Sequence, residues 1–323
     1  MKIYRKRIIM PKLQGIEEKY INGIKVDKEN DVCFFNDEFH KYYNKQDMKP
    51  YISVTQLVAA YEQPFQEDFW ASYKALEKIL DAENFSIIKK TLLTTKTFDK
   101  RIIKKLDINP NDFESVRQSI LKEWKDKKEE ACQHGSEQHL IKELSFYGNK
   151  HFDLSRYGFK DCVGDYDCTY NYYKLDKERA IYPEFLIAID YDGLRISGQA
   201  DLIIKDGNDI YIGDWKTNAE LKTTSYYDKR TKSNVMMKYP LNTIQDCSMG
   251  HYTCQLSLYA FMLQYINPNF NIKQLEIIHI DRNGKETLYP VEYKKKEIEN
   301  LLAHYKKMKK IQEELDKDKP FII

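Results

Sequence analysis

The order of apolar and polar residues predicts a helical first part of the chain. After short β-like stretches at 32–35 and 51–54, Thr55 is the expected N-cap of a helix that stops before Pro64. Residues 66–147 read as mostly helical. From Ser115 onward, apolar residues recur at roughly helical spacing, so one long helix should continue to Leu144.

From Pro183 the pattern changes to strands. Residues 183–190, 194–205 and 209–217 are rich in β-branched residues and are separated by two Asp-Gly turns. Such turns join antiparallel strands, so these three stretches should form a meander. The preceding residues, 148–183, are rich in Tyr, Asp and Gly and show weak periodicity.

The remainder alternates between helix and strand. A polar loop at 218–248 precedes an apolar helix at about 250–266, a strand at 275–282, a turn at Asn283-Gly284 and a C-terminal helix ending near Asp316. This order of elements predicts an α/β or α+β core with a helical N-terminal elaboration.

Composition excludes several classes of protein. The chain has 323 residues, 42% hydrophobic and 32% charged, which is enough apolar material for a core. No apolar run approaches the roughly 20 residues of a membrane span, and the basic N-terminus lacks the apolar stretch of a secretory signal. Six cysteines without a C-x-x-C pair indicate reduced thiols in a cytoplasmic protein, without a membrane partner.

The net charge by itself does not indicate a nucleic-acid-binding protein. The chain has 52 Lys and Arg against 50 Asp and Glu, giving +2. A polyanionic partner would therefore need locally segregated bases. Two segments meet this condition: residues 89–128 hold 12 basic against 6 acidic residues, and residues 216–238 hold 6 against 2.

Two aspartates carry the candidate chemistry. Asp201 and Asp214 lie in neighbouring β-like stretches on either side of the second Asp-Gly turn, so the two strands can bring their carboxylates together. Adjacent carboxylates repel unless a cation holds them, and oxygen ligands suit Mg²⁺ or Mn²⁺. Lys216, two residues after Asp214, points to the same face of the strand and could stabilise developing charge. Taken alone, this spacing also occurs by chance, and strand-end Asp residues are common.

Other features support a site near these aspartates. Glu184 adds a carboxylate in the first strand of the meander, and His139 lies on the long helix one turn after Gly135. Gln255 and Tyr259 share one face of the apolar helix because they are four residues apart. Each feature alone has an ordinary structural explanation.

As an ordered set, these segments resemble the RecB-type branch of the PD-(D/E)XK nuclease superfamily. The matching pieces are G-S-x-x-H (Gly135 to His139), Pro183-Glu184, Gly198-Gln-Ala-Asp201-Leu, Gly213-Asp-Trp-Lys-Thr217 and Q-x-x-x-Y (Gln255 and Tyr259). They cover about residues 131–281. His40-Lys-Tyr-Tyr and Ser53-Val-Thr55 look like segments of phage-encoded members, so a host cytoplasm is the expected location if the gene belongs to a phage.

The resemblance implies a fold, domains and residue roles. The fold would be a restriction-endonuclease-like α/β core, with a central mixed β-sheet flanked by helices. It would occupy residues 131–292, between an N-terminal β/helical elaboration at 1–130 and a C-terminal helix at 293–323 packed on the core. The implied metal ligands are His139, Asp201, Asp214, Glu184 and the Trp215 backbone carbonyl; the implied catalytic groups are Lys216, Asp201, Asp214 and Glu184. Gln255 and Tyr259 would organise the site or touch the DNA.

The implied activity is hydrolysis of phosphodiester bonds in DNA with Mg²⁺ or Mn²⁺. The iron–sulfur members of the family have cysteines after the Q-x-x-x-Y helix, but none follows Cys254, so no iron–sulfur cluster is expected. The chain also lacks a G-x-x-x-x-G-K-[ST] run, so no nucleotide cofactor is expected.

Several alternatives stay open. An exonuclease acting on double- or single-stranded DNA ends in replication, recombination or repair is the first reading. An endonuclease for flap or branched DNA, an RNA-directed nuclease and a catalytically silent DNA-binding subunit are the others. The expected protein partners are a recombinase, a helicase or a single-strand-binding protein. The basic residues expected to contact DNA from the 218–248 loop are Lys229, Arg230, Lys232 and Lys238.

Overall fold

The computed structural model describes residues 18–170, 174–229 and 231–317. These described residues form two compact units: those within 18–63 together with those within 137–317, and residues 64–136. The predicted N-terminal segment 1–130 therefore contributes to both units. None of the described helices is both long and apolar enough to cross a membrane.

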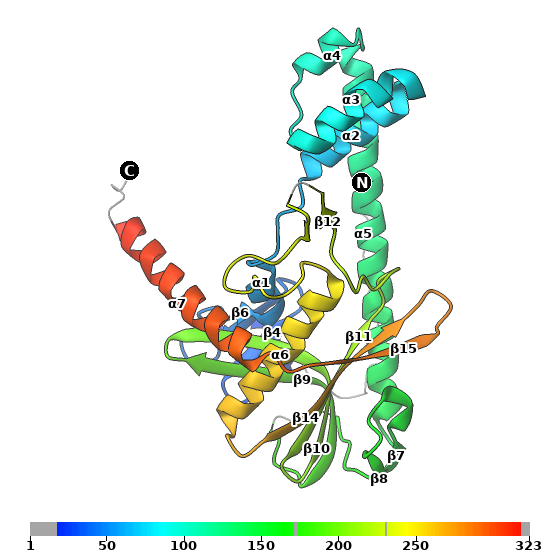
Figure 1. The fold of residues 1–323 in the computed structure, drawn as a ribbon. Helices are drawn as coiled ribbons and strands as arrows, with labels where there is room; N and C mark the ends of the chain where they lie inside the picture. Colours follow the sequence, from blue (N-terminus) through cyan, green and yellow to red (C-terminus); the bar gives the residue numbers. More distant parts are fainter. Residues whose placement is uncertain (1–17, 171–173, 230, 318–323) are drawn as a thin grey trace. The chain divides into compact units, whose positions relative to one another are not determined.

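A six-stranded mixed sheet is the centre of the larger unit (Figure 1). Its strands are β6 (Ile52–Ser53), β9 (Arg179–Tyr191), β10 (Leu194–Asp206), β11 (Asp209–Lys216), β14 (Asn271–Ile280) and β15 (Glu286–Val291). They run in the order β15-β14-β11-β10-β6, with β9 paired to β10. The predicted meander is confirmed, because β9, β10 and β11 are successively antiparallel.

Tight turns set the register of the meander. Asp192 and Gly193 have φ of 48° and 82°, and the Gly193 amide donates to Asp190 Oδ1 at 2.7 Å. Two consecutive residues with positive φ suit the right-handed twist of a hairpin. β11 is parallel to β14, so the chain must cross over between them, and helix α6 (Ser248–Ile266) makes that connection.

Helices cover the sheet, as predicted for an α/β core. α6, α1 (Val54–Ala59) and α7 (Lys295–Lys317) pack into one large apolar cluster, in which α6 is buried nearly all round. A second cluster surrounds Trp215, with Phe146 from α5 (Pro110–Phe146) and Tyr157 from the short helix η1 (Ser155–Tyr157). Both faces of the sheet are therefore shielded from water around the strands that carry the candidate chemistry.

The N-cap of α1 differs from the prediction. Ser53, rather than Thr55, is the capping residue: its side chain accepts a hydrogen bond from the Gln56 amide, and the Gln56 side chain accepts one from the Ser53 amide. Thr55 lies two residues further on, inside the helix. The reciprocal Ser–Gln pair satisfies two backbone donors and so defines the start of the helix.

Short strands decorate the larger unit. They are β1 (Tyr20–Ile21), β2 (Ile24–Lys25), β3 (Lys28–Glu29), β4 (Cys33–Asn36), β5 (Lys41–Asn44), β7 (His151–Asp153), β8 (Val163–Asp165), β12 (Tyr227–Asp228) and β13 (Ser233–Asn234). β12 and β13 form a small hairpin inside the segment predicted to be a polar loop.

The smaller unit, residues 64–136, is helical, as its periodicity predicts. It contains α2 (Glu67–Ile79), α3 (Ala82–Thr95), α4 (Arg101–Lys105) and the first part of α5. A separate apolar core holds these helices, with Leu76, Phe85 and Ile120 among its buried side chains.

Strand β10 changes its neighbour along one edge. Ile196 and Ser197 pair with β6, whereas residues 202–206 pair with β11. Residues 198–201 lie between these two partners, so backbone groups there need other contacts. Helix α6 supplies one, because the Tyr259 hydroxyl donates to the Gln199 carbonyl at 2.8 Å.

Glycine at position 198 permits this approach of α6. A Cβ added to Gly198 would lie 2.9 Å from Tyr259 Cε1 and 3.1 Å from Val54 Cγ2. We predict that Gly198→Ala lowers the free energy of unfolding by about 1–3 kcal/mol, the usual cost of overpacking. Urea titration would measure it, and the cost should largely disappear in a Tyr259→Ala background. An equal loss in both backgrounds would contradict the clash with Tyr259.

Candidate metal-binding site

Three carboxylates lie in one row across three adjacent strands. Ala200 and Leu202 pair with Phe185 and Pro183, so Asp201 on β10 stands opposite Glu184 on β9. On the other side, Leu202 pairs with Gly213, and the same register places Asp201 opposite Asp214 on β11. Asp201 and Glu184 interrupt an otherwise continuous β9–β10 ladder, whereas Asp201 and Asp214 lie just beyond the last paired residues of β10 and β11.

Glu184 has an unusual backbone for a strand residue. Its φ is 49°, in the left-handed region that favours glycine. This conformation costs about 1–2 kcal/mol for a residue with a Cβ, and such costs are concentrated at functional sites. The Glu184 carbonyl accepts a hydrogen bond from Lys28 Nζ at 3.2 Å, and its carboxylate accepts one from the Gln199 side chain.

His139 reaches the row from helix α5. Its Nδ1 lies 3.0 Å from Glu184 Oε1 and 3.5 Å from Asp201 Oδ1. Burial opposes a charge on the ring, but Asp201 and Glu184 outweigh this effect and raise the pKa of His139 to about 9. The imidazolium is therefore a cation held between two carboxylates at neutral pH.

The two carboxylates next to His139, Asp201 and Glu184, have pKa values shifted in opposite directions. Burial, together with the neighbouring Asp214 carboxylate, raises the pKa of Asp201 well above its usual value. Burial has the same tendency at Glu184, but the hydrogen bond with His139 and the charge of Lys28 hold the pKa of Glu184 below its usual value. Asp201 also accepts a hydrogen bond on Oδ2 from the Trp215 amide at 2.7 Å.

Asp214 contacts two residues that the sequence analysis singled out, Gln255 and Lys216. Gln255 Nε2 donates to Asp214 Oδ1 at 3.0 Å, and Lys216 Nζ lies 2.6 Å from Oδ2. Burial opposes the charge of Lys216, but Asp214 and Asp201 raise the pKa of Lys216 above its usual value. The Lys216 ammonium also lies 4.6 Å from the ring centroid of Tyr252 on α6.

The donor atoms fit a divalent cation. One ligand atom each from His139, Glu184 and Asp201 lies within 4.8 Å of the others. Asp214 Oδ2 is buried and, apart from the Lys216 ion pair, accepts no hydrogen bond from the part of the chain that the structure describes. A mixed set of carboxylate oxygens and one imidazole suits Mg²⁺ or Mn²⁺, which tolerate such ligands.

The structure thus brings together most of the residues singled out in the sequence. Those gathered at the carboxylate row are His139, Glu184, Asp201, Asp214, Trp215, Lys216 and Gln255. Tyr259 is 2% exposed and contacts the adjacent Gln199 backbone. Trp215 contacts the row through its amide; a ligand role for its carbonyl stays a prediction.

The basic loop residues lie apart from these contacts. Lys229, Lys232 and Lys238 are exposed, and Lys238 Nζ donates to the Ala60 carbonyl at 3.4 Å. Arg230 lies outside the described residues.

Three residues at the site were not singled out in the sequence. Lys28 Nζ donates to both the Glu184 carbonyl and Glu143 Oε1, Glu143 is buried one turn after His139, and Gln199 binds Glu184. Burial raises the pKa of Glu143 above its usual value. The four-residue spacing of His139 and Glu143 was a usable signal for Glu143, and Gln199 lies inside the G-Q-A-D segment. Lys28 had no local signal.

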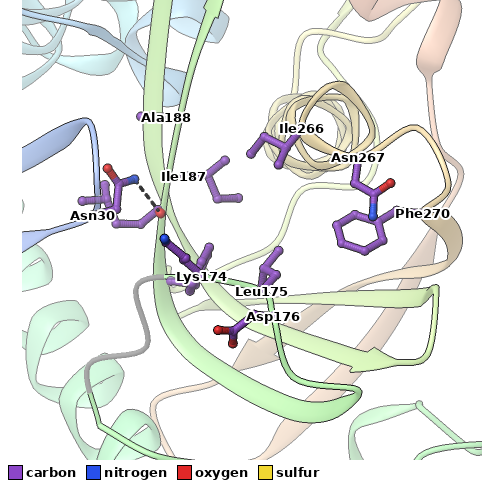
Figure 2. A pocket seen from close by; sticks show the side chains of 11 residues that line it. Asn30, Lys174, Leu175, Asp176, Ile187, Ala188, Ile266, Asn267 and Phe270 are labelled. Carbon is purple, nitrogen blue, oxygen red and sulfur yellow. Dashed lines mark hydrogen bonds between the residues drawn. The ribbon is translucent and has the colours of Figure 1, made fainter.

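A pocket of about 350 Å³ lies beside β9, the strand that carries Glu184, but no residue of the carboxylate row lines it. Figure 2 shows it beside β9, where Asn30 Nδ2 donates to the Leu186 carbonyl at 3.3 Å. Its lining is mostly apolar, including Leu175, Ile187 and Phe270. The candidate chemistry is therefore at the carboxylate row and not in this pocket.

Comparisons with known proteins identify the segment that carries most of this row. Residues 168–321 match the model of the PD-(D/E)XK nuclease superfamily. No curated protein is significantly similar to the chain. Among solved structures, SSO0001 is 17% identical over 38% of this chain, which spans half the length of that protein, with a TM-score of 0.22. A Eubacterium rectale protein described as a "putative exonuclease" is 10% identical, covering 79% of this chain and 76% of its own, with a TM-score of 0.29.

The matched segment contains Glu184, Asp201, Asp214, Lys216, Gln255 and Tyr259, whereas His139 precedes it. The order of these residues, their convergence on one row and the surrounding mixed sheet agree with the family match. Residues 168–321 of the chain are therefore similar to the PD-(D/E)XK nuclease superfamily.

Proposed function

We propose that this protein is a Mg²⁺- or Mn²⁺-dependent deoxyribonuclease that acts as an exonuclease on DNA ends in replication, recombination or repair. The observation that carries the proposal is the row of Glu184, Asp201 and Asp214, with His139 at one end and Lys216 at the other. A buried row of acids is costly unless a cation compensates it. The match of residues 168–321 to a nuclease superfamily supports the reaction class.

The residues of the row would divide the work. His139, Glu184 and Asp201 would hold a divalent cation, with Asp214 beside them; the bound ion would polarise the scissile phosphate and lower the pKa of the attacking water. Lys216 would place a positive charge next to the reacting phosphate, where negative charge develops. Gln255 would keep Asp214 oriented, and Tyr259 would hold the backbone of β10 against α6.

Removing either end of the Asp214–Lys216 pair should abolish cleavage. We expect Asp214→Ala and Lys216→Ala each to lower the rate of DNA cleavage by about 10²-fold or more, because the first removes an expected metal ligand and the second removes positive charge next to the reacting phosphate. End-labelled DNA incubated with Mn²⁺ gives the rate, and circular dichroism checks folding. Lys273→Ala, at an exposed lysine of β14, is the matched control and should keep full activity. A fully active Lys216→Ala enzyme would refute the role assigned to Lys216.

Metal binding should become tighter as the pH rises. His139 is protonated below its pKa of about 9, and a cation can use the ring only after that proton leaves. We expect the affinity for Mn²⁺ to rise by about tenfold per pH unit between pH 6.5 and 8.5, with release of at least one proton. Calorimetry in buffers of different ionisation enthalpy measures both quantities. His139→Gln should bind more weakly and show a shallower pH dependence; an affinity independent of pH in the parent protein would contradict the assignment.

The topology of the DNA separates the two nuclease alternatives. With Mg²⁺ or Mn²⁺, we expect degradation of linear end-labelled DNA and no cleavage of closed circular DNA, because an exonuclease requires an end. Cleavage of the circle would favour an endonuclease. No cleavage of either substrate, with DNA binding retained, would favour a catalytically silent subunit.

A further inference from the structure

Exposed tyrosines are concentrated in the segment that follows the candidate lysine. Of the strongly exposed tyrosines in the described part of the chain (Tyr20, Tyr226, Tyr227, Tyr239 and Tyr265), three lie within residues 226–239. Their side chains are 64%, 52% and 68% exposed. Most other described tyrosines are buried or half-buried, so the high tyrosine content of the chain does not by itself explain this group.

Lysines surround these tyrosines in the chain. Lys222, Lys229, Lys232 and Lys238 are all exposed. The described acidic residues of the segment 218–248 are fewer, and Asp246 is already engaged by His251 at 2.6 Å. The segment therefore combines exposed aromatic rings and positive charge within a short stretch of sequence.

The described residues of this segment, predicted to be a polar loop, contain the β12–β13 hairpin and several internal hydrogen bonds. Gln245 Oε1 accepts hydrogen bonds from the Ser225 amide at 2.9 Å and from Asn234 Nδ2 at 2.8 Å. Met237, Leu241 and Ile244 are buried in the main apolar cluster. Exposed side chains on such a frame are held in place, which lowers the entropic cost of binding a ligand.

Both ends of the segment lie beside elements that carry residues of the carboxylate row. It begins two residues after Lys216, where the Asn218 carbonyl contacts His279 Nε2 of β14 at 2.7 Å. It ends at α6, which supplies Gln255 to Asp214 and Tyr252 to Lys216. The segment therefore connects two elements of the candidate metal site.

We propose that the described residues 218–229 and 231–248 bind a single strand of DNA, with Tyr226, Tyr227 and Tyr239 stacking on unpaired bases and the lysines contacting phosphates. The inference rests on the proposed nuclease function and narrows its substrate to single-stranded ends. Aromatic stacking requires the face of a base, which a paired base inside a duplex does not expose, whereas phosphate contacts serve both forms. The combination therefore selects the unpaired form.

Equilibrium binding of labelled DNA to the metal-free full-length protein tests the inference without cleavage. In EDTA, we expect a single-stranded oligonucleotide to bind more tightly than a blunt duplex of the same length. Tyr227→Ala and Tyr239→Ala should each weaken single-strand binding by about fivefold or more and leave duplex binding nearly unchanged. Tyr227→Phe and Tyr239→Phe should bind as the parent does, because stacking needs the ring and not the hydroxyl.

Matched variants separate stacking from charge and from general surface effects. Tyr20→Ala removes an equally exposed tyrosine outside the segment and should change nothing. Lys229→Ala should weaken both single-strand and duplex binding and lower the salt dependence, because it removes a phosphate contact without sequence or strand preference.

The outcomes distinguish this inference from the function on which it rests. Equal affinity for single strand and duplex, or unchanged single-strand binding in both alanine variants, would overturn the single-strand assignment even if the parent protein cleaves DNA. A parent protein that binds single strands in the expected way but never cleaves them would uphold this inference and refute the nuclease proposal. Loss of binding in the phenylalanine variants as well would overturn the stacking assignment.

Discussion

Repulsion between neighbouring carboxylates is the constraint on which the candidate site depends. Glu184, Asp201 and Asp214 stand in one row on three strands, largely out of water. Burial and mutual repulsion both oppose negative charge on neighbouring carboxylates. The compensation comes from different parts of the chain: His139 from α5 between Glu184 and Asp201, and Lys216 beside Asp214. A divalent cation bound at the row would reduce the repulsion that remains among its three carboxylates.

The neighbouring elements make this arrangement specific. β10 leaves β6 before it joins β11, and α6 contacts the intervening residues through Tyr259. Lys28 of β3 binds the Glu184 carbonyl, where the backbone is left-handed, and also Glu143 on the helix that carries His139. Elements that are far apart in sequence thus control the orientation of a single acidic residue. The segment 218–248 connects β11 to α6, two elements of the site, and its described part carries exposed aromatic and basic side chains.

Local sequence patterns predicted the features that depend on local backbone geometry, namely strands, tight turns and the faces of helices. The Asp-Gly turns and β-rich runs predicted the meander, and the meander placed Asp201 opposite Asp214. The i,i+4 spacing correctly put Gln255 and Tyr259 on one side of α6, where both reach the row or its backbone. The Ser53 cap was missed in favour of Thr55 because both residue types suit an N-cap, and only the Gln56 partner distinguishes them. Lys28 lies 156 residues from Glu184, and no periodicity reports a contact of that kind. The order within 218–248 was missed because its polar side chains fold onto one another and onto a few buried apolar residues.

The short turns of the meander have a consequence for how the chain can vary. The number of residues between each acid and the turns after Tyr191 and Asp206 determines its position in the row. One residue inserted into either turn would shift the pairing and send a carboxylate to the opposite face of the sheet. These turns are distant from the three carboxylates in sequence, yet they determine where the carboxylates lie. Insertions in these two exposed hairpins would therefore displace the carboxylates, although neither turn contains a residue of the row.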